Sequence, residues 1–241
     1  KTYSNHNRSP RTSPRFRVMC PRGDIFMYGD STMAIQMKFP TTYAEQLAKL
    51  KNRGCVIEDE AACCEVLKAV NYYRLSAYFL PFKGVDDRYK DGTTFRKVYR
   101  IYEFDRKLRG ILFSAVEEVE IFLRSRFAYY HAHKYGATGY LDSGNYSDKH
   151  NAEKFNATLQ REIENNKKVL FVKHHLEKYD GVFPIWAIVE LFTFGTLSYF
   201  YADLTTQDKK QLADELYQTT PKNWTSWLRC CTDLRNICAH Y

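Results

Sequence analysis

The feature that most constrains this chain is one long segment with the period of an α-helix, from about Phe95 to Tyr135, which Gly136 follows. Side chains three or four positions apart share one face of a helix, whereas a strand alternates strictly. The segment therefore predicts a single long helix closed by the glycine. The apolar residues at this spacing are Leu108, Leu112, Ala115, Val119, Phe122 and Phe127.

The rest of the chain from residue 39 onward also has helical spacing, together with helix-capping residues. A capping box, Thr42-x-x-Glu45, opens a helix that ends at Gly54, and Asp59 opens a second one. No segment alternates as a strand would, so the predicted fold class is all-α, with six to eight helices. The later helices are expected over 148–179, from Pro184 onward, over 206–217 and from Thr220-Pro221 to the end, the last with a stripe of Trp224, Trp227, Leu228, Cys231, Leu234 and Cys238.

Residues 1–38 differ from the rest because they lack any period and carry most of the basic excess. The chain has 36 Lys and Arg against 28 Asp and Glu, a net charge of +8, of which these 38 residues contribute +5. We predict a flexible basic leader over 1–38 and one domain over 39–241. The body of the protein is therefore only mildly basic.

The seven cysteines form no Cys-x-x-Cys pair, and no secretory leader is visible, so we expect a reducing cytoplasm and no metal or other cofactor. The apolar run 182–201 contains Pro184, Glu190 and Gly195. A charge in the middle of a membrane span costs roughly 2.5–3.5 kcal/mol. We therefore expect this run to form core helices and no membrane partner.

The common catalytic motifs are absent: the chain has no nucleotide-binding glycine loop, no His-Glu-x-x-His and no Gly-x-Ser-x-Gly. What remains is the end of the chain, where Arg235, Asn236 and His240 form Arg-Asn-x-x-x-His. Taken alone, this spacing leaves two interpretations open. It is either a catalytic motif or a solvated arginine and a histidine near a terminus.

Further stretches appear in a consistent order along the chain. They are Tyr43-x-x-Gln46-Leu47, Asn71-Tyr72-Tyr73-Arg74-Leu75-Ser76, Tyr102-x-Phe104-Asp105-Arg106, Glu117-x-x-Glu120-x-x-x-Arg124 and Pro184-x-Trp186-x-x-x-Glu190-x-x-x-Phe194-Gly195. Together with the terminal motif, they resemble the bacterial Abi-like (AbiD/AbiF) abortive-infection family. The resemblance covers about 40–241 and leaves out the leader.

That family is similar to HEPN-domain ribonucleases, whose motif also occurs in RNA-guided type VI CRISPR effectors. The resemblance implies a HEPN-like helical bundle with additional N-terminal helices, and a metal-independent endoribonuclease that acts as a toxin in phage defence. It also implies a bacterial cytoplasmic location. Family members can be encoded beside structured noncoding RNAs, so the resemblance also suggests a regulatory noncoding RNA as a partner. Family members continue beyond the histidine, which leaves open a truncated C-terminus here.

The residues of the motif suit this chemistry. Cleaving RNA without a metal requires a base for the 2′-hydroxyl, an acid for the leaving 5′-oxygen and positive charge at the phosphate. An imidazole such as that of His240 serves as acid or base near neutral pH, and the planar fork of Arg235 suits phosphate oxygens. Asn236 precedes His240 by one helical turn and is expected to orient it.

Three charged residues are expected to support the site. Glu120 and Arg124 are spaced i,i+4 on the long helix, where they form either a second layer around the motif or a solvated ion pair worth roughly 0.3–0.5 kcal/mol. Glu190 lies inside an apolar helix. We therefore predict that it is buried and paired with an arginine of the long or the last helix.

A basic stretch with interleaved tyrosines is the candidate for RNA binding. Its basic residues are Arg96, Lys97, Arg100, Arg106 and Arg109, with Tyr99 and Tyr102 between them. The basic side chains would bind RNA there through its phosphates, and the tyrosines would stack on its bases. An ordinary amphipathic helix is the alternative.

One motif supplies one imidazole, whereas the reaction benefits from two. We therefore expect a homodimer in which Arg235 and His240 of both subunits line a shared cleft. Two other functions remain open at this point. One is a non-catalytic RNA-binding protein, and the other is a helical adaptor without RNA.

Overall fold

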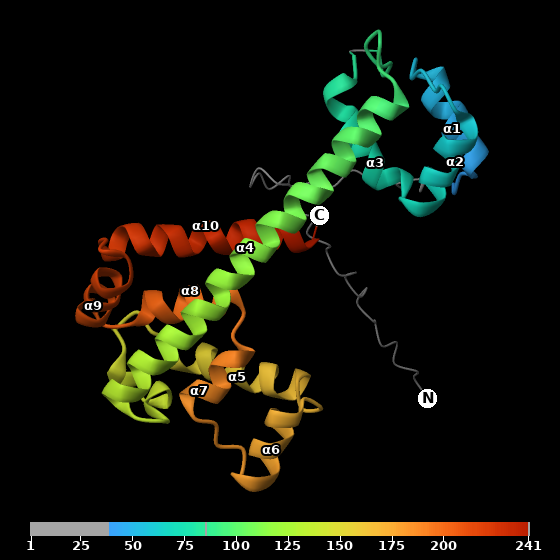
Figure 1. Cartoon of the computed structure of the whole chain (residues 1–241). Coiled ribbons are helices and arrows are strands. Elements are labelled where there is room, and N and C mark those ends of the chain that lie inside the picture. The colour runs from blue at the N-terminus through green and yellow to red at the C-terminus, as the bar shows by residue number, and fades with distance from the viewer. Residues whose placement is uncertain (1–38, 85, 241) are drawn as a thin grey trace, which may run out of the picture. The chain divides into compact units, whose positions relative to one another are not determined.

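The computed structural model describes residues 39–84 and 86–240, and the predicted leader lies outside them. Within these residues the fold is all-helical, as predicted, with only isolated β-bridges and no strand. It has ten α-helices, more than the six to eight expected. They are α1 (Tyr43–Asn52), α2 (Glu60–Ala69), α3 (Tyr72–Phe79), α4 (Phe95–Tyr135), α5 (Ala152–Asn165), α6 (Leu170–Lys178), α7 (Ile185–Ile188), α8 (Phe194–Asp203), α9 (Thr206–Tyr217) and α10 (Pro221–His240) (Figure 1).

The long helix α4 has the boundaries that the sequence predicts. At its start, the Thr94 side chain accepts a hydrogen bond from the Lys97 N–H, which caps the first turn. At its end, Gly136 has a φ of +81°, a conformation that side chains rarely adopt. The cap and the glycine both lie next to the ends of the helix. They therefore set its limits without depending on contacts with distant parts of the chain.

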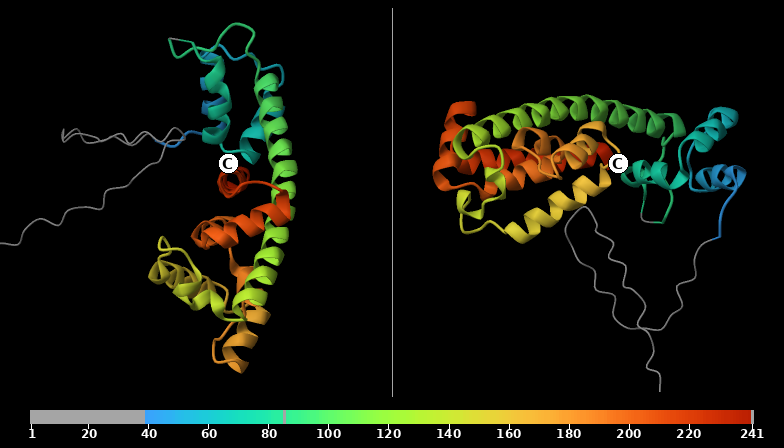
Figure 2. Two further views of the ribbon diagram at one scale, coloured as in Figure 1. Left: turned by 90° about the vertical axis from the view of Figure 1, so that its left-hand side faces the viewer. Right: turned by 90° about the horizontal axis from the view of Figure 1, so that it is seen from below.

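Two hydrophobic clusters pack along α4. The N-terminal cluster joins α1–α3 to the start of α4 around Leu50, Phe79 and Val98. The C-terminal cluster packs α7–α10 against the end of α4, around Phe127 and Trp224. Between the clusters, residues 103–115 of α4 contain no buried side chain. Figure 2 shows α4 running past both groups of helices.

The buried face of α4 differs from the row of apolar residues that indicates its helical period. Of those six residues, only Phe127 is buried, while Leu108 and Phe122 are 40% and 42% exposed. The core instead receives Val116 and Leu123. Because α4 has apolar residues on two faces, periodicity alone could not identify the one that packs.

The last helix follows its prediction more closely. α10 begins at Pro221, and Trp224 and Leu228 are buried in the C-terminal cluster. Cys231 and Leu234 pack against this cluster as partly buried residues. Trp227, however, is 49% exposed, so the stripe is narrower than expected.

The helix expected over 148–179 is broken, whereas the apolar run 182–201 forms separate helices, as expected. The charged segment 148–179 forms α5 and α6, and the apolar run 182–201 forms α7, the 3₁₀ turn η4 (Val189–Leu191) and α8. The apolar run is divided because the Thr193 side chain caps α8 by accepting from the Thr196 N–H. Among the described residues, no helix is both long and apolar enough to cross a membrane.

Candidate active site

Arg235, from α10, lies against the middle of α4. Its guanidinium carbon is 5.7 Å from the centre of the Phe113 ring, at the distance of a cation–π contact. The two helices enclose a pocket of about 220 Å³ here, which we call the arginine pocket. It is lined by Phe113, Glu117, Glu120, Ile121, Arg124 and Arg235.

Glu120 lies between the two arginines of this pocket and is only 7% exposed. Its Oε1 accepts a hydrogen bond of 2.5 Å from Arg124 Nη2, and its Oε2 lies 3.9 Å from Arg235 Nε. A buried carboxylate requires such partners because it has lost its hydration. The structure thus supports a buried charge network and not the alternative of a solvated ion pair.

Arg124 also ties α4 to the turn that follows α7. Its Nε and Nη2 donate hydrogen bonds of 3.2 and 2.8 Å to the carbonyl oxygen of Phe192, directly after η4. Carbonyl groups at the end of a helical turn lack partners within it, so this guanidinium satisfies one of them. The position of Arg124 is therefore set from two sides.

Arg235 is less fully satisfied. Its Nε is buried and donates no hydrogen bond to any group in the described part of the chain. A guanidinium has five N–H donors and no acceptor, so an arginine that lines a pocket can hold an anion such as phosphate. The pocket lining contains two arginines together with the carboxylates of Glu117 and Glu120, so its formal charges balance.

The other two motif residues point elsewhere. Asn236 and His240 are both exposed, whereas Arg235 is partly buried against α4. At about 100° per residue, Asn236 and His240 lie within roughly 40° of each other, and His240 lies about 140° from Arg235. Asn236 and His240 thus share a face of α10, but one chain does not bring the arginine and the histidine together.

The prediction of a buried, paired Glu190 is wrong. Glu190 is exposed and belongs to the turn η4, because the apolar run does not continue as one helix. It lines a second pocket, of about 530 Å³, which also includes Arg124. Among the described residues no ion pair between Glu190 and an arginine is formed.

The five basic residues proposed for RNA binding do not form one surface. Arg96, Lys97 and Arg100 are exposed and line one shallow pocket. Arg106 lies about 120° around the helix from Arg100, and Arg109 is paired with Asp105 at 2.9 Å. Helical geometry distributes a basic run of this length over several faces.

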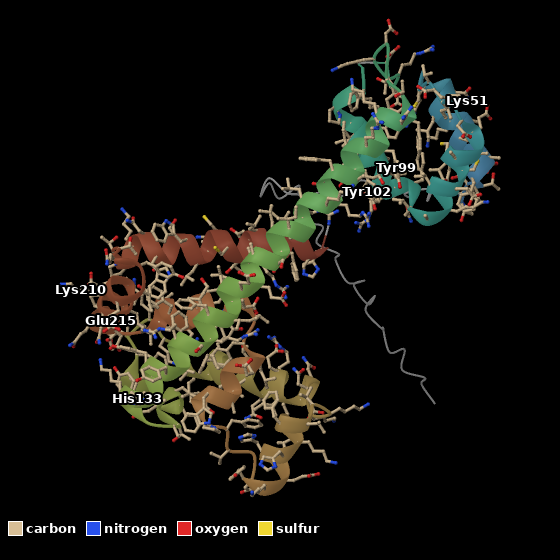
Figure 3. The ribbon with its side chains drawn as sticks, in the orientation of Figure 1. Lys51, Tyr99, Tyr102, His133, Lys210 and Glu215 are labelled. Carbon is tan, nitrogen blue, oxygen red and sulfur yellow. The ribbon has the colours of Figure 1, made fainter. Side chains whose placement is uncertain are left out.

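The two tyrosines of the same stretch are occupied by packing. Tyr102 is 8% exposed and meets Tyr78 edge to face, with ring centres 5.4 Å apart. Tyr99 stacks on Tyr102 at 5.9 Å, near the end of α4 that joins the N-terminal cluster (Figure 3). The expectation that both rings stack on bases is therefore not supported by their positions.

Sequence reasoning missed a second buried charge in the C-terminal cluster. Asp208 is fully buried and accepts hydrogen bonds of 2.7 Å from the hydroxyls of Tyr130 and Tyr135, as well as one from Lys134. Burial acts to raise the pKa of Asp208, but hydrogen bonds from these groups and Thr205 outweigh it and hold the pKa below its usual value. The signal available in the sequence was the cap Thr205-x-x-Asp208, which predicts a helix start but not burial.

His131 is also fully buried, and neither ring nitrogen has a hydrogen-bond partner in the described structure. Its ring packs near those of Tyr135 and Phe200, with centres 4.9 and 5.4 Å away. Burial lowers the pKa of His131 to about 4, so the ring is neutral at physiological pH. Across the described residues, no three His, Cys, Asp or Glu side chains are grouped as metal ligands.

Comparison with known proteins gives one family match. A family model described as Abi-like protein matches residues 65–241. No curated protein and no solved structure matches the chain. The matched range contains the arginine pocket and the terminal motif.

Proposed function

The chain belongs to the Abi-like protein family, and from that premise we propose that it is a metal-independent endoribonuclease that acts as an abortive-infection effector. Family membership itself implies a role in abortive infection, a form of phage defence. The nuclease activity, and with it the relationship to HEPN ribonucleases, is the proposal. The observation that carries it is Arg235, which lines the arginine pocket beside the buried Glu120 and whose buried Nε has no hydrogen-bond acceptor among the described residues.

In this proposal the arginine pocket binds the phosphate that is cleaved. Arg235 and Arg124 supply donors and charge to the phosphate oxygens, and Glu120 holds both guanidiniums in place. The 2′-oxygen attacks phosphorus and loses its proton to a base, while the bond to the 5′-oxygen breaks and that oxygen receives a proton. The products are a 2′,3′-cyclic phosphate and a 5′-hydroxyl.

His240 is the acid or base in this reaction, and Asn236, on the same face of α10, is its orienting group. Because His240 and Arg235 of one chain face apart, a second copy is the simplest source of the missing imidazole. We propose a homodimer in which the histidine of each subunit reaches the arginine pocket of the other. Exposed apolar side chains on α10, Ile237 at 52% and Trp227 at 49%, support a contact between copies there.

The test is to incubate the purified protein with a mixed RNA pool in EDTA, beside Arg235→Ala and His240→Ala variants. We expect cleavage in EDTA that leaves cyclic or 3′-phosphate ends, and loss of cleavage in each variant. A 2′-deoxy nucleotide on the 5′ side of the cut should block it. Products with 3′-hydroxyl ends, or a strict need for Mg²⁺, would contradict the mechanism.

The homodimer has its own test. Mixing the two inactive variants should restore part of the activity, because a mixed dimer contains one arginine pocket and one histidine that are intact and belong to different chains. Sedimentation should show a dimer under the same conditions. An active protein that sediments as a monomer at every concentration would rule out the shared site.

A second candidate is an RNA-binding protein without catalysis. The exposed position of His240, away from Arg235, favours it, because one chain then has a phosphate pocket but no acid or base beside it. Filter binding separates the two functions. A non-catalytic binder retains RNA with an affinity that falls steeply with salt, yet leaves it uncut.

A further inference from the structure

A second pocket adjoins the arginine pocket along α4. It has a volume of about 530 Å³, within the range of roughly 300–1,000 Å³ that small-ligand sites occupy. One wall is the later part of α4, and the other is α7 with the turn η4. Arg124 lines both pockets, so a ligand that crosses from one to the other passes this guanidinium.

The walls of this second pocket offer two large rings to solvent. Trp186 of α7 is 57% exposed, and Tyr129 of α4 is 61% exposed. Between the walls the α4 side chains are small, since Ala128 and Ala132 line the pocket. Exposed aromatic rings beside small apolar side chains suit stacking with a planar ring, and every nucleobase has such a face.

The spacing along α4 fits a nucleotide chain. Arg124 and Ala128 are one helical turn apart, a rise of about 6 Å. A phosphate held by Arg124 and Arg235 would therefore have the base of the adjoining nucleotide level with Ala128 and Tyr129. Positive charge beside aromatic rings is the combination that binds single-stranded nucleic acid.

The polar groups of the pocket are few. Glu190 presents an exposed carboxylate, which accepts hydrogen bonds and donates none. His133, near the far end of α4 in Figure 3, lies with its ring 4.2 Å from that of Tyr129. Guanine has two adjacent N–H donors on its Watson–Crick edge, which match the two oxygens of a carboxylate. Uracil offers a single donor there.

We propose that this pocket binds the base of the nucleotide next to the cleaved phosphate in single-stranded RNA, with Trp186 and Tyr129 as stacking surfaces and Glu190 as the group that selects guanine. The inference rests on the proposed function for the position of the phosphate. It gives Glu190 and Trp186 a role in substrate choice, and it predicts cuts beside guanines.

The experiment measures binding of short 2′-O-methyl RNAs, which cannot be cleaved through the 2′-oxygen, to the full-length protein by fluorescence anisotropy. One probe is an oligouridine, and the other has a single central guanine. The parent should bind the guanine probe more tightly. Trp186→Ala should weaken its binding by about 5- to 150-fold, the equivalent of about 1–3 kcal/mol for one stacked base, while Trp186→Phe keeps most of it.

Glu190→Gln should abolish the preference for guanine and leave oligouridine binding unchanged. The matched control is Tyr73→Ala, which removes a ring that is 85% exposed on α3, far along the sequence from the pocket. Thermal melting of each variant shows whether it is folded. If a folded Trp186→Ala binds both probes as Tyr73→Ala does, or if Glu190→Gln keeps the preference, the subsite is disproved.

This test is separable from that of the nuclease. If the protein does not cut RNA in EDTA but shows the guanine preference and its loss in Glu190→Gln, the proposed reaction fails and the base subsite stands. If Arg235-dependent cutting occurs at sites that neither Trp186→Ala nor Glu190→Gln alters, the reaction stands and the subsite fails.

Discussion

The two hydrophobic clusters along α4 differ in where their charged side chains lie. In the N-terminal cluster the ion pairs lie at the surface: the Lys51 and Glu60 side chains, for example, are 41% and 57% exposed. In the C-terminal cluster, Glu120, His131 and Asp208 are buried, and Thr93 is the one other buried polar side chain that the described residues contain. The first region is therefore held together by apolar packing, while the second also encloses ionisable groups.

This difference supports the proposed position of the site in the C-terminal region. Burying a charge costs free energy unless partners replace its hydration, so such groups mark places where the fold is organised around polar contacts. Functional sites are enriched in them. The arginine pocket and the proposed base pocket both adjoin the C-terminal cluster, and the buried Glu120 belongs to the first of them. Three substitutions test the contrast.

The largest effect is expected at Asp208. Replacing it with alanine would leave Lys134, Tyr130 and Tyr135 without their shared acceptor, and breaking a buried pair typically costs about 3–5 kcal/mol. Urea denaturation should show this loss of unfolding free energy. The control, Glu60→Ala in the N-terminal region, should cost at most about 1 kcal/mol. Equal losses of unfolding free energy in the two variants would show that buried charge does not distinguish the two regions.

A matched comparison on α4 itself should give a smaller difference. Glu120–Arg124 and Asp105–Arg109 are both i,i+4 pairs, but the side chains of the two acidic residues, taken without their backbone atoms, are 10% and 37% exposed. We expect Glu120→Ala to cost about 1.5–3 kcal/mol, as for hydrogen bonds between charged groups in the interior. Asp105→Ala should cost at most about 1 kcal/mol of unfolding free energy, although it also removes the acceptor of a hydrogen bond from the Tyr78 hydroxyl. Thermal melting of both variants measures the two losses of stability. A larger loss for Asp105→Ala than for Glu120→Ala would show that the buried pair is not the more important one.

A third effect concerns pH. Because burial lowers the pKa of His131 to about 4 from an ordinary 6.5, the unfolded chain binds a proton more readily than the folded one between these values. The contribution of His131 to stability is complete above pH 6.5 and is lost as the pH falls toward 4, by up to about 1.4 kcal/mol per pH unit. Nearby Asp208 and Lys134 act on this pKa in opposite directions.

Denaturation of the parent and of His131→Phe from pH 7 to pH 4.5 isolates this contribution, since the carboxylates titrate in both proteins. Phenylalanine keeps an aromatic ring against Phe200 and removes the titrating group. The parent should lose more stability than the variant over that interval. Parallel curves would show that His131 is not protonated on unfolding.

Much of the local structure could be predicted because its signals are local. Asp59 caps α2 by accepting from the Ala62 N–H, Asn71 caps α3 in the same way, and Gly54 ends the first helical segment with a φ of +88°. The sequence missed the break between α5 and α6, whereas Gly195 was expected to interrupt the apolar run and α8 begins one residue before it. A charged run continues the helical period across a break such as that between α5 and α6, so the period conceals it.

The candidate site was predictable only in part. Arg235 and Glu120 were both singled out, but their contact joins residues 115 positions apart, since α10 packs against α4. Glu190 was placed in the core because its neighbours are apolar, whereas it lies on a short turn that faces solvent. Residues that are adjacent in the sequence belong to the same helix or turn, but some of them are buried while others are exposed.

The sequence by itself determined the helical class and the limits of α4, and it contains the arginines on which the proposed function rests. Capping, backbone conformation and side-chain chemistry act within a few residues. Only the tertiary structure decided which of the two apolar faces of α4 is buried, that Arg235 meets Glu120, and that His240 faces away from both. Those outcomes depend on the free energy of packing summed over all the helices at once. No single segment of the chain contains that information.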